Sequence, residues 1–347
     1  MAYTTIDDPE LYFQVKTWTG NGSTQSITLD GDENMQPDWV WIKNRGATAS
    51  HILTDVIRGV TKNLFSDKTE TEETISTRIT SFDSDGFSLG SEANVNASSN
   101  TYVAWNWKAG GSASSNSNGD ITSSVSASTT AGFSIVSWTG NGTDDATVGH
   151  GLSQKPDMVI IKARENTSSW ATWHKNLTGS NYLLFLDAQD AQSQYTDLLK
   201  NQSSSVLTLG TNSASNSNGQ GFIAYCFAEK KGYSKVGTYT GNGNVNGTFV
   251  YTGFKPAMII IKKNGAGDNW HIYDNKVNPT NVMDTNLRPN LNDAEITNAN
   301  HNLDFVSNGF KWRTTSNTRQ GSGSEVFYMA FAESPFVNSK GIPTNAR

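Results

Sequence analysis

The chain of 347 residues is 35% hydrophobic and 17% charged, and its formal net charge is −6. So few charged residues argue against a fold of amphipathic helices, which need charged outer faces. Ten tryptophans argue against a disordered chain, because they bring large apolar areas that favour burial. The acidic balance argues against nucleic acid and anionic membranes as partners, since both attract a basic surface.

The first residues and the cysteine content indicate where the chain is made. Residues 1–10 hold no basic stretch followed by an apolar run, so we expect no signal peptide and synthesis in the cytoplasm. No segment approaches the roughly 18 apolar residues of a membrane span, so we expect no membrane insertion. Cys226 is the only cysteine, and one cysteine cannot form a disulfide framework.

Three motifs recur along the chain in one order, which indicates an internal repeat. The first is an aromatic residue followed by Thr-Gly-Asn-Gly, at residues 18–22, 138–142 and 239–243. The second is a proline and an apolar run ending in lysine, at residues 36–43, 155–162 and 255–262. The third is an aromatic run, at residues 102–109, 222–229 and 326–333. Their nearly constant spacing defines three copies of a unit of about 100 residues.

Short apolar runs and turn signals predict the strands within each copy. Each run from proline to lysine is rich in β-branched and aromatic residues, which is typical of a buried strand. Residues 133–138 alternate apolar and polar side chains, which predicts another strand. Ser-Asp-Gly at 84–86 and Ser-Asn-Gly at 307–309 predict tight turns, because Gly and Asn accept positive φ. The pattern predicts an all-β fold of antiparallel β-sandwich or jelly-roll domains.

The repeat divides the chain into three predicted β-sandwich domains in tandem, at residues 1–110, 133–230 and 231–336. Residues 111–132 are rich in Gly, Ser and Thr, which predicts a flexible linker or an extended crossing segment. Residues 337–347 form a C-terminal tail. Because little chain separates the second copy from the third, we expect these two to pack together as a block. We expect one unit to anchor the protein while the other projects.

The acidic residues do not form a recognisable catalytic constellation. Asp83 and Asp85 are close in sequence, but the glycine after them favours a turn. Glu229 and Glu333 end equivalent strands where the first copy has Ala109, which favours solvated strand ends. Neither set resembles the acids that alternate along a glycosidase strand. We therefore predict no catalytic residue and no enzyme activity.

The histidines and glycines give no stronger signal. His174 and His271 each follow a tryptophan, and His51 is close to the same place in the first copy. A metal site would need further ligands at fixed spacing, so a histidine beside a core tryptophan is the favoured interpretation. A nucleophile elbow and a phosphate loop are both missing. We predict no metal ion and no cofactor.

Sugar binding is the ligand hypothesis that the composition leaves open. Lectin sites stack an aromatic ring on the sugar and orient it with amide hydrogen bonds. The candidate residues are Trp170, Trp173, Trp270, Asn21, Asn141 and Asn242. The competing interpretation places the tryptophans in the core and assigns each asparagine to turn geometry.

The three motifs, with Ser-Asp-Gly-Phe-x-Leu-Gly between the second and the third, resemble a repeated domain common in marine bacteriophage proteins. The resemblance runs from Tyr12 to Phe336 and continues into the tail, although the third copy has Ala257 where the others have Asp38 and Asp157. It implies concanavalin A-like jelly rolls. It also implies a virion protein that is made in the host cytoplasm and exposed on the particle, as a head decoration protein or a short fibre.

Two functional hypotheses follow. In the first, the protein is a structural component of the virion surface that binds capsid or tail subunits, as a homo-oligomer on the particle. In the second, it is a receptor-binding tail fibre or adhesin that recognises host surface glycans. Exposed aromatic residues in matching loops of all three copies would favour the adhesin, and buried tryptophans would favour the structural component.

Overall fold

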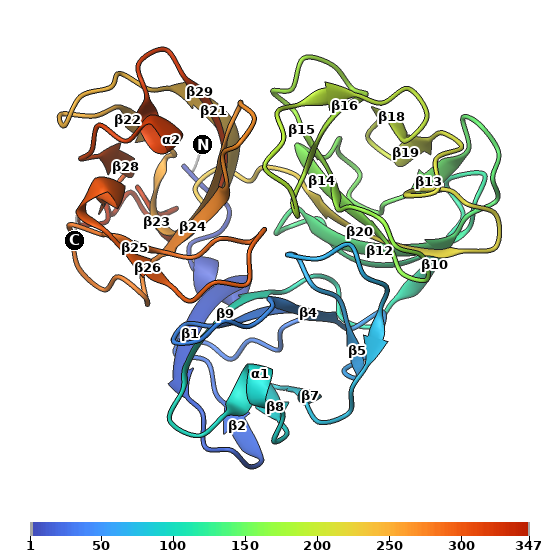
Figure 1. Ribbon diagram of the computed structural model, residues 1–347, viewed down its shortest axis with the longest axis horizontal. Coiled ribbons are helices and arrows are strands. Elements are labelled where there is room, and N and C mark those ends of the chain that lie inside the picture. Colours follow the sequence, from blue (N-terminus) through green and yellow to red (C-terminus); the bar gives the residue numbers. More distant parts are fainter. Residues whose placement is uncertain (1–2, 346–347) are drawn as a thin grey trace.

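The computed structural model describes residues 3–345 and shows an all-β chain of antiparallel sheets. Three lobes surround a common centre, and each lobe contains one copy of the repeat (Figure 1). The all-β, antiparallel fold predicted from the sequence is confirmed. The finer assignment of each copy to a jelly roll stays a prediction.

The first copy folds into two antiparallel sheets that enclose one core. The larger has the order β1–β9–β3–β4, formed by Phe13–Thr19, Thr101–Trp107, Trp39–Asn44 and Ile52–Asp55. The smaller has the order β2–β8–β7, formed by Gln25–Ile27, Gly86–Leu89 and Ile79–Asp83. Ile42 and Phe87, from opposite sheets, belong to one buried cluster. The short elements of this copy are η1 (Pro9–Leu11), β5 (Lys62–Asn63), β6 (Glu73–Thr74) and α1 (Ala93–Asn96).

The third copy repeats this arrangement. Its larger sheet has the order β21–β29–β23–β24, formed by Ser234–Thr240, Glu325–Pro335, Phe254–Lys263 and Trp270–Asp274. Its smaller sheet has the order β22–β28–β27, formed by Phe249–Tyr251, Gly309–Trp312 and Leu303–Val306. Tyr328 and Phe310 join the two sheets in one buried cluster. The short elements are β25 (Thr285–Asn286), β26 (Ile296–Thr297), η2 (Ala299–His301) and α2 (Asn317–Gln320).

The second copy has the same sheets, and its larger sheet is extended at both edges. Its central order β12–β20–β14–β15 is formed by Phe133–Thr139, Gly221–Phe227, Met158–Ala163 and Ala171–His174. Beyond β15 lie β16 (Tyr182–Phe185) and β17 (Ser193–Gln194), and beyond β12 lie β11 (Ser123–Ser128) and β10 (Ser114–Asn116). The smaller sheet has the order β13–β19–β18, formed by Thr147–Gly149, Val206–Leu209 and Leu199–Gln202.

Within residues 111–132, Ser114–Asn116 and Ser123–Ser128 are strands of this sheet, so of the two predicted alternatives the segment is extended and is not a flexible linker. The strand β11 pairs with β12 from Ser124↔Ser137 to Ser128↔Phe133. The edge of β12 offers unpaired backbone groups, and the polar segment satisfies them although its own β propensity is modest. Val125 is buried against the second copy, which adds an apolar anchor.

Asp38 and Asp157, which the third copy replaces with Ala257, bind the backbone just beyond the last strand of their copies. The Asp38 carboxylate accepts hydrogen bonds from the backbone N–H groups of Ala109 and Gly111, at 2.7 and 3.0 Å. Asp157 accepts one from the backbone of Glu229 at 2.7 Å. With Ala257 in this position, β23 and β29 instead continue to pair as far as Phe254↔Pro335. The aspartate thus marks the point where the chain leaves one copy for the next.

Three aromatic side chains, one from each copy, meet near the centre of the molecule. The ring centroids are 6.5 Å apart for Trp107 and Phe227, 5.9 Å for Phe227 and Phe331, and 5.6 Å for Trp107 and Phe331. All three side chains are buried and belong to a single cluster that spans the copies. Since burial of such rings is a dominant source of stability, the copies form one body. The second and third copies are in contact, as expected, but the first copy packs against both, so the two do not form a separate block.

Candidate functional site

Trp170 and Trp270, two of the predicted sugar-binding residues, lie at junctions between copies. Trp170 is fully buried, and its Nε1 donates a hydrogen bond of 2.7 Å to the carbonyl oxygen of Phe65 in the first copy. Trp270 is 2% exposed, and its Nε1 donates a hydrogen bond of 2.9 Å to the carbonyl oxygen of Phe185 in the second copy. Their ring faces are therefore closed to a sugar, and the predicted stacking role is wrong for both.

His51 occupies in the first copy the position that Trp170 and Trp270 hold in the other two. In each copy, the residue that follows this position pairs with the isoleucine just before the buried lysine of the neighbouring strand. Trp41 Nε1 donates to His51 Nδ1 at 2.9 Å, so the ring proton lies on Nε2, which is 3.0 Å from the carbonyl oxygen of Arg288 in the third copy. Burial holds the pKa of His51 well below its usual value, so the ring is neutral. The three ring N–H donors thus link the copies in a closed cycle.

Trp173, the third predicted stacking residue, belongs to the core of the second copy. It is 3% exposed, and its Nε1 donates to the carbonyl oxygen of Gly179 at 3.4 Å. The Lys155 ammonium lies 5.3 Å from its ring centroid. Trp173 therefore presents no open face to a ligand, and its predicted sugar-binding role is wrong too.

Asn21, Asn141 and Asn242 are exposed, one in each copy, and all three make the same turn. The side-chain oxygen of each accepts a hydrogen bond from the backbone N–H two residues later, at 2.8, 2.9 and 3.0 Å. The glycine after each asparagine has a positive φ, between 65° and 74°, which only glycine adopts readily. These contacts favour turn geometry, and the structure does not bring the asparagines together with the tryptophans.

Three lysines, for which the sequence analysis proposed no role, are buried, and two of them contact a neighbouring copy. Lys43, Lys162 and Lys262 end the second motif of each copy, and all are 0% exposed. Lys162 Nζ donates to the carbonyl oxygen of Thr69 in the first copy at 3.1 Å, and Lys43 Nζ to that of Asn292 in the third at 3.4 Å. Burial lowers the pKa of each lysine to about 8. The signal in the sequence is a charged residue that closes a fully apolar run in every copy.

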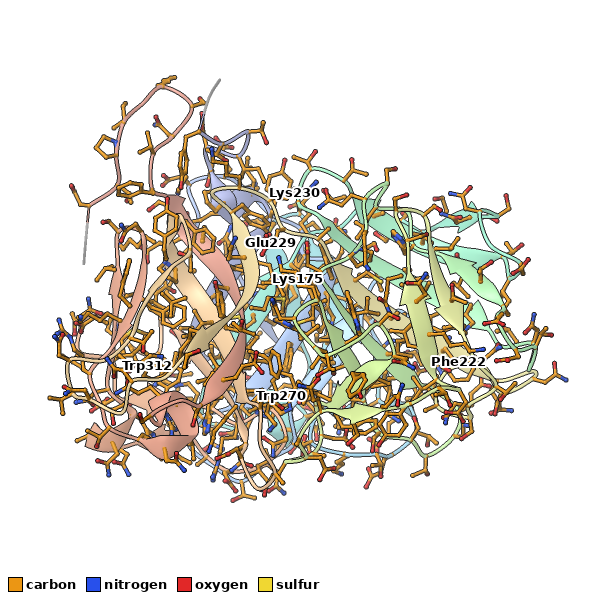
Figure 2. The ribbon with its side chains drawn as sticks, turned by 90° about the horizontal axis from the view of Figure 1, so that it is seen from above. Lys175, Phe222, Glu229, Lys230, Trp270 and Trp312 are labelled. Carbon is orange, nitrogen blue, oxygen red and sulfur yellow. The ribbon has the colours of Figure 1, made fainter. Side chains whose placement is uncertain are left out.

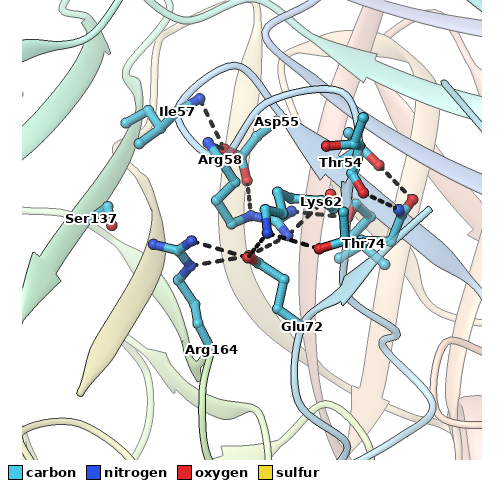
Figure 3. Close-up of polar contacts among 12 residues, drawn as sticks. Thr54, Asp55, Ile57, Arg58, Lys62, Glu72, Thr74, Ser137 and Arg164 are labelled. Atoms are coloured by element: carbon cyan, nitrogen blue, oxygen red, sulfur yellow. Dashed lines mark hydrogen bonds and ion pairs between the residues drawn. The ribbon is translucent and has the colours of Figure 1, made fainter. Parts of the chain in front are cut away.

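A buried ionic cluster joins the first copy to the second (Figure 3). The side chains of Asp55 and Arg58 are fully buried and pair at 2.5 Å. Glu72 of the first copy lies 3.3 Å from Arg58 and accepts two hydrogen bonds of 3.0 Å from Arg164 of the second. Tyr225 of the second copy donates to Asp55 at 2.8 Å. Buried charges persist only where they are paired and hydrogen-bonded, so these residues hold the copies together.

The strand-end acids are also engaged in ion pairs. Lys175 Nζ lies 2.6 Å from Glu229 and 3.3 Å from Asp157, and Lys255 Nζ lies 2.6 Å from Glu333. Lys175 and Glu229 lie towards one end of the short axis of the molecule, whereas Trp270 lies towards the other (Figure 2). Each of these carboxylates is paired with a lysine, and Lys175 is shared by Glu229 and Asp157.

One sheet edge differs between the copies and forms the candidate interaction surface. In the third copy, β22 is the edge strand of its sheet and exposes Phe249 by 45% and Tyr251 by 52%. The equivalent edge of the first copy, β2, presents polar Gln25 and Ser26, and that of the second, β13, is covered by a bridge from Ile121 to its central residue. An exposed edge strand with aromatic side chains is a ready site for pairing with another chain.

The described part of the chain holds no group of three or more His, Cys, Asp or Glu side chains that could bind a metal ion. Among residues 3–345, no helix combines the length and the apolar character that crossing a bilayer requires.

The fold and these contacts define a class of protein: an all-β body of three fused repeats, in which buried ring N–H donors join each repeat to the next. The chain belongs to the family described as "Domain of unknown function (DUF7483)", whose model matches residues 8–335. The match spans all three copies, so the family unit is the complete three-lobed body. Neither the curated proteins nor the solved structures contain a match to this chain.

Proposed function

We propose that this protein is a structural component of a bacteriophage particle surface, a head decoration protein or part of a short fibre, that binds other virion subunits. The resemblance of the motifs to a repeated domain of marine bacteriophage proteins supports the assignment to a phage particle. The closed cycle of junctions supports a rigid building unit, because Trp170, Trp270 and His51, which could otherwise hold a ligand, are occupied by contacts between copies.

The observation that carries the proposal is the open edge of β22. Phe249 and Tyr251 point outward from this strand on either side of the buried Val250. A partner strand that adds to β22 would gain main-chain hydrogen bonds and cover both rings. Within residues 3–345, neither of the other two copies exposes an aromatic side chain on an edge strand, so the proposed attachment is through the third copy.

The test uses particles purified from cells infected with a phage that encodes this chain. Mass spectrometry and cryo-electron microscopy of those particles should find the chain in multiple copies per particle. The double variant Phe249→Ser/Tyr251→Ser should fold normally and be missing from purified particles. The matched control Val282→Ser removes another exposed apolar side chain, 51% exposed, from the same copy and should be incorporated. Particles without the protein, or normal incorporation of the double variant, would contradict the proposal.

A second candidate function, an adhesin for host surface glycans, has a specific observation in its favour. A cavity of about 580 Å³ is lined by Tyr3 and Tyr251 together with Glu229, Lys231 and Lys235. Aromatic rings beside charged and polar groups are typical of saccharide sites. Under this hypothesis, Tyr251→Ala abolishes binding on a glycan array and Phe249→Ser does not, whereas an assembly edge requires both residues.

A further inference from the structure

The third copy contains a basic pocket of about 270 Å³. It lies between the start of β24, the strand β26 and the helix α2. Two guanidinium groups, Arg288 and Arg319, and two imidazoles, His271 and His301, line it, and the exposed residues Asn298 and Asn300 form its rim. No aspartate or glutamate lies among the lining residues.

Arg319 is buried, and neutral groups are its hydrogen-bond partners. It is 3% exposed, its Nε donates to the hydroxyl of Tyr273 at 2.6 Å, and its Nη1 donates to the hydroxyl of Thr318 at 2.6 Å. Within residues 3–345, no carboxylate lies within 4.0 Å of this guanidinium. A buried charge normally has a counter-charge, and here that partner is missing on the side of the pocket.

Arg288 is only partly satisfied. One of its terminal nitrogens pairs with Asp293, while its Nε is buried and makes no hydrogen bond within the described chain. Burial and the nearby Arg319 charge both lower the pKa of Arg288. The positive charges of Arg288 and Arg319 thus lie close together, and Arg288 Nε has no acceptor within the described chain.

The imidazoles leave a further donor without an acceptor. His271 Nδ1 lies 2.9 Å from the side-chain oxygen of Asn286 and 3.3 Å from Arg319 Nη2. The Asn286 oxygen can only accept, so His271 Nδ1 carries the proton and donates to it, and Arg319 Nη2 has no acceptor there. Asn286 also contacts His301 Nδ1 at 2.6 Å. Burial, followed by the charges of Arg319 and Arg288, lowers the pKa of His301 to about 4.

The other two copies show that the fold does not require this pocket. The strand register aligns His271 with Ile52 and Ala171, and both of those are buried core residues. Gln320, Asn96 and Asn216 are equivalent, because the carbonyl oxygen of each accepts a hydrogen bond from the last glycine of the Thr-Gly-Asn-Gly turn in its copy. Arg319 is the residue before Gln320. The residues before Asn96 and Asn216, which are Val95 and Ser215, are fully buried. The third copy has therefore exchanged small or apolar side chains for an imidazole, His271, and a guanidinium, Arg319, at equivalent places.

We propose that this pocket binds a tetrahedral oxyanion, a sulfate or phosphate group carried by a larger ligand that enters past Asn298 and Asn300. The two guanidiniums and the His301 imidazole, whose Nδ1 accepts from Asn286 and whose proton therefore lies on Nε2, supply donors that suit the oxygens of a tetrahedral anion. The anion supplies the counter-charge that Arg319 lacks and an acceptor for Arg288 Nε. The pocket volume of about 270 Å³ is sufficient for one such group. This site is separate from the β22 edge and does not depend on the proposed function.

The test is calorimetric titration of the full chain with inorganic phosphate, sulfate or acetate, in Tris buffer at constant ionic strength. We expect one saturable site per chain for phosphate, sulfate or both, and weaker binding of acetate. Arg288→Gln and Arg319→Gln should each weaken binding about tenfold or more, since hydrogen bonds to charged groups are the stronger ones. Arg313→Gln is the matched control, because Arg313 pairs with Asp304 outside the pocket, and it should bind like the wild type.

Arg319 is buried, so the half-buried His301 provides a second variant, His301→Gln, that retains the fold and should also weaken binding. Selectivity for phosphate identifies a phosphorylated ligand, and selectivity for sulfate identifies a sulfated one. The proposal is overturned if neither anion saturates a site up to about 10 mM. It is also overturned if acetate binds more tightly than both, or if Arg288→Gln and His301→Gln bind like the wild type.

Discussion

Tyr225 of the second copy donates a hydrogen bond of 2.8 Å to Asp55 of the first. The matching contact between the first copy and the third is made by Trp105, whose Nε1 donates to Asp274 at 3.2 Å. The strand register places Tyr225 and Trp105 at equivalent positions, and Asp55 and Asp274 likewise. Two of the three junctions therefore centre on a buried carboxylate that receives an aromatic donor.

The third junction uses neutral groups at the same positions. Met329 replaces the aromatic donor and His174 replaces the aspartate, and His174 Nε2 lies 3.2 Å from the carbonyl oxygen of Tyr328. Burial lowers the pKa of His174 to about 4, so the ring is uncharged at neutral pH. At these positions the second and third copies therefore depend on packing and neutral hydrogen bonds, and their ion pair, Lys235 with Glu229 at 3.6 Å, lies elsewhere.

Tyr225→Phe should lower the free energy of unfolding by about 1–3 kcal/mol, because it leaves a buried carboxylate oxygen of Asp55 with one donor fewer. Urea denaturation followed by tryptophan fluorescence measures the change. Tyr182→Phe removes a hydroxyl from a half-buried tyrosine outside the junction and should change stability by less than about 0.5 kcal/mol. Equal effects of the two variants would show that the Tyr225–Asp55 hydrogen bond contributes nothing.

Glu72→Gln should cost about 3–5 kcal/mol, because it leaves Arg58 and Arg164 with an uncompensated charge in a buried cluster. The same denaturation experiment measures it. Glu70→Gln is the control: Glu70 is 55% exposed and pairs with Lys68 at the surface, so its loss should cost at most about 1 kcal/mol. A small effect of Glu72→Gln would mean that the two copies do not depend on this cluster.

Trp170→Phe should destabilise the protein by about 1–3 kcal/mol more than Trp18→Phe does. Both changes remove a similar volume from a buried site. Only Trp170 loses a hydrogen bond across a junction, since Trp18 Nε1 has no partner in the described chain. Thermal unfolding of the two variants, compared with the wild type, checks the difference. Equal melting temperatures would remove the junction hydrogen bond as a source of stability.

The buried lysines predict how stability changes in alkaline solution. The pKa of Lys162 falls from 10.5 to about 8 on folding, so between these values the unfolded chain binds more protons than the folded chain. Stability therefore rises with pH across this window, and the penalty of burying the charged form is greatest below pH 8. The same sign applies to Lys43 and Lys262.

Lys162→Met should flatten this rise, because the substituted side chain does not titrate. Unfolding in urea at several pH values between 7.5 and 9.5 gives the two slopes. The exposed Lys231→Met is the control and should leave the slope of the wild type unchanged. An unaltered slope in Lys162→Met would show that this lysine keeps its ordinary pKa in the folded protein.

The sequence was sufficient for the features that depend on local pattern. The three copies, the buried strands that end at Lys43, Lys162 and Lys262, and the asparagine turns all rest on residues close together in the chain. Strand periodicity and turn chemistry are local properties, so they can be predicted without knowing the neighbours.

The tertiary structure alone decided what surrounds those elements. The sequence around Trp170 and Trp270 does not indicate whether these side chains are exposed or buried. Each is covered by a neighbouring copy. His51 and Arg288, which close the cycle of junctions, are 237 residues apart. Residues 123–128 have a linker-like composition, yet they form a strand because β12 offers an open edge. The sequence thus determined the repeated unit, and packing between copies determined which of its side chains remain free to bind a ligand.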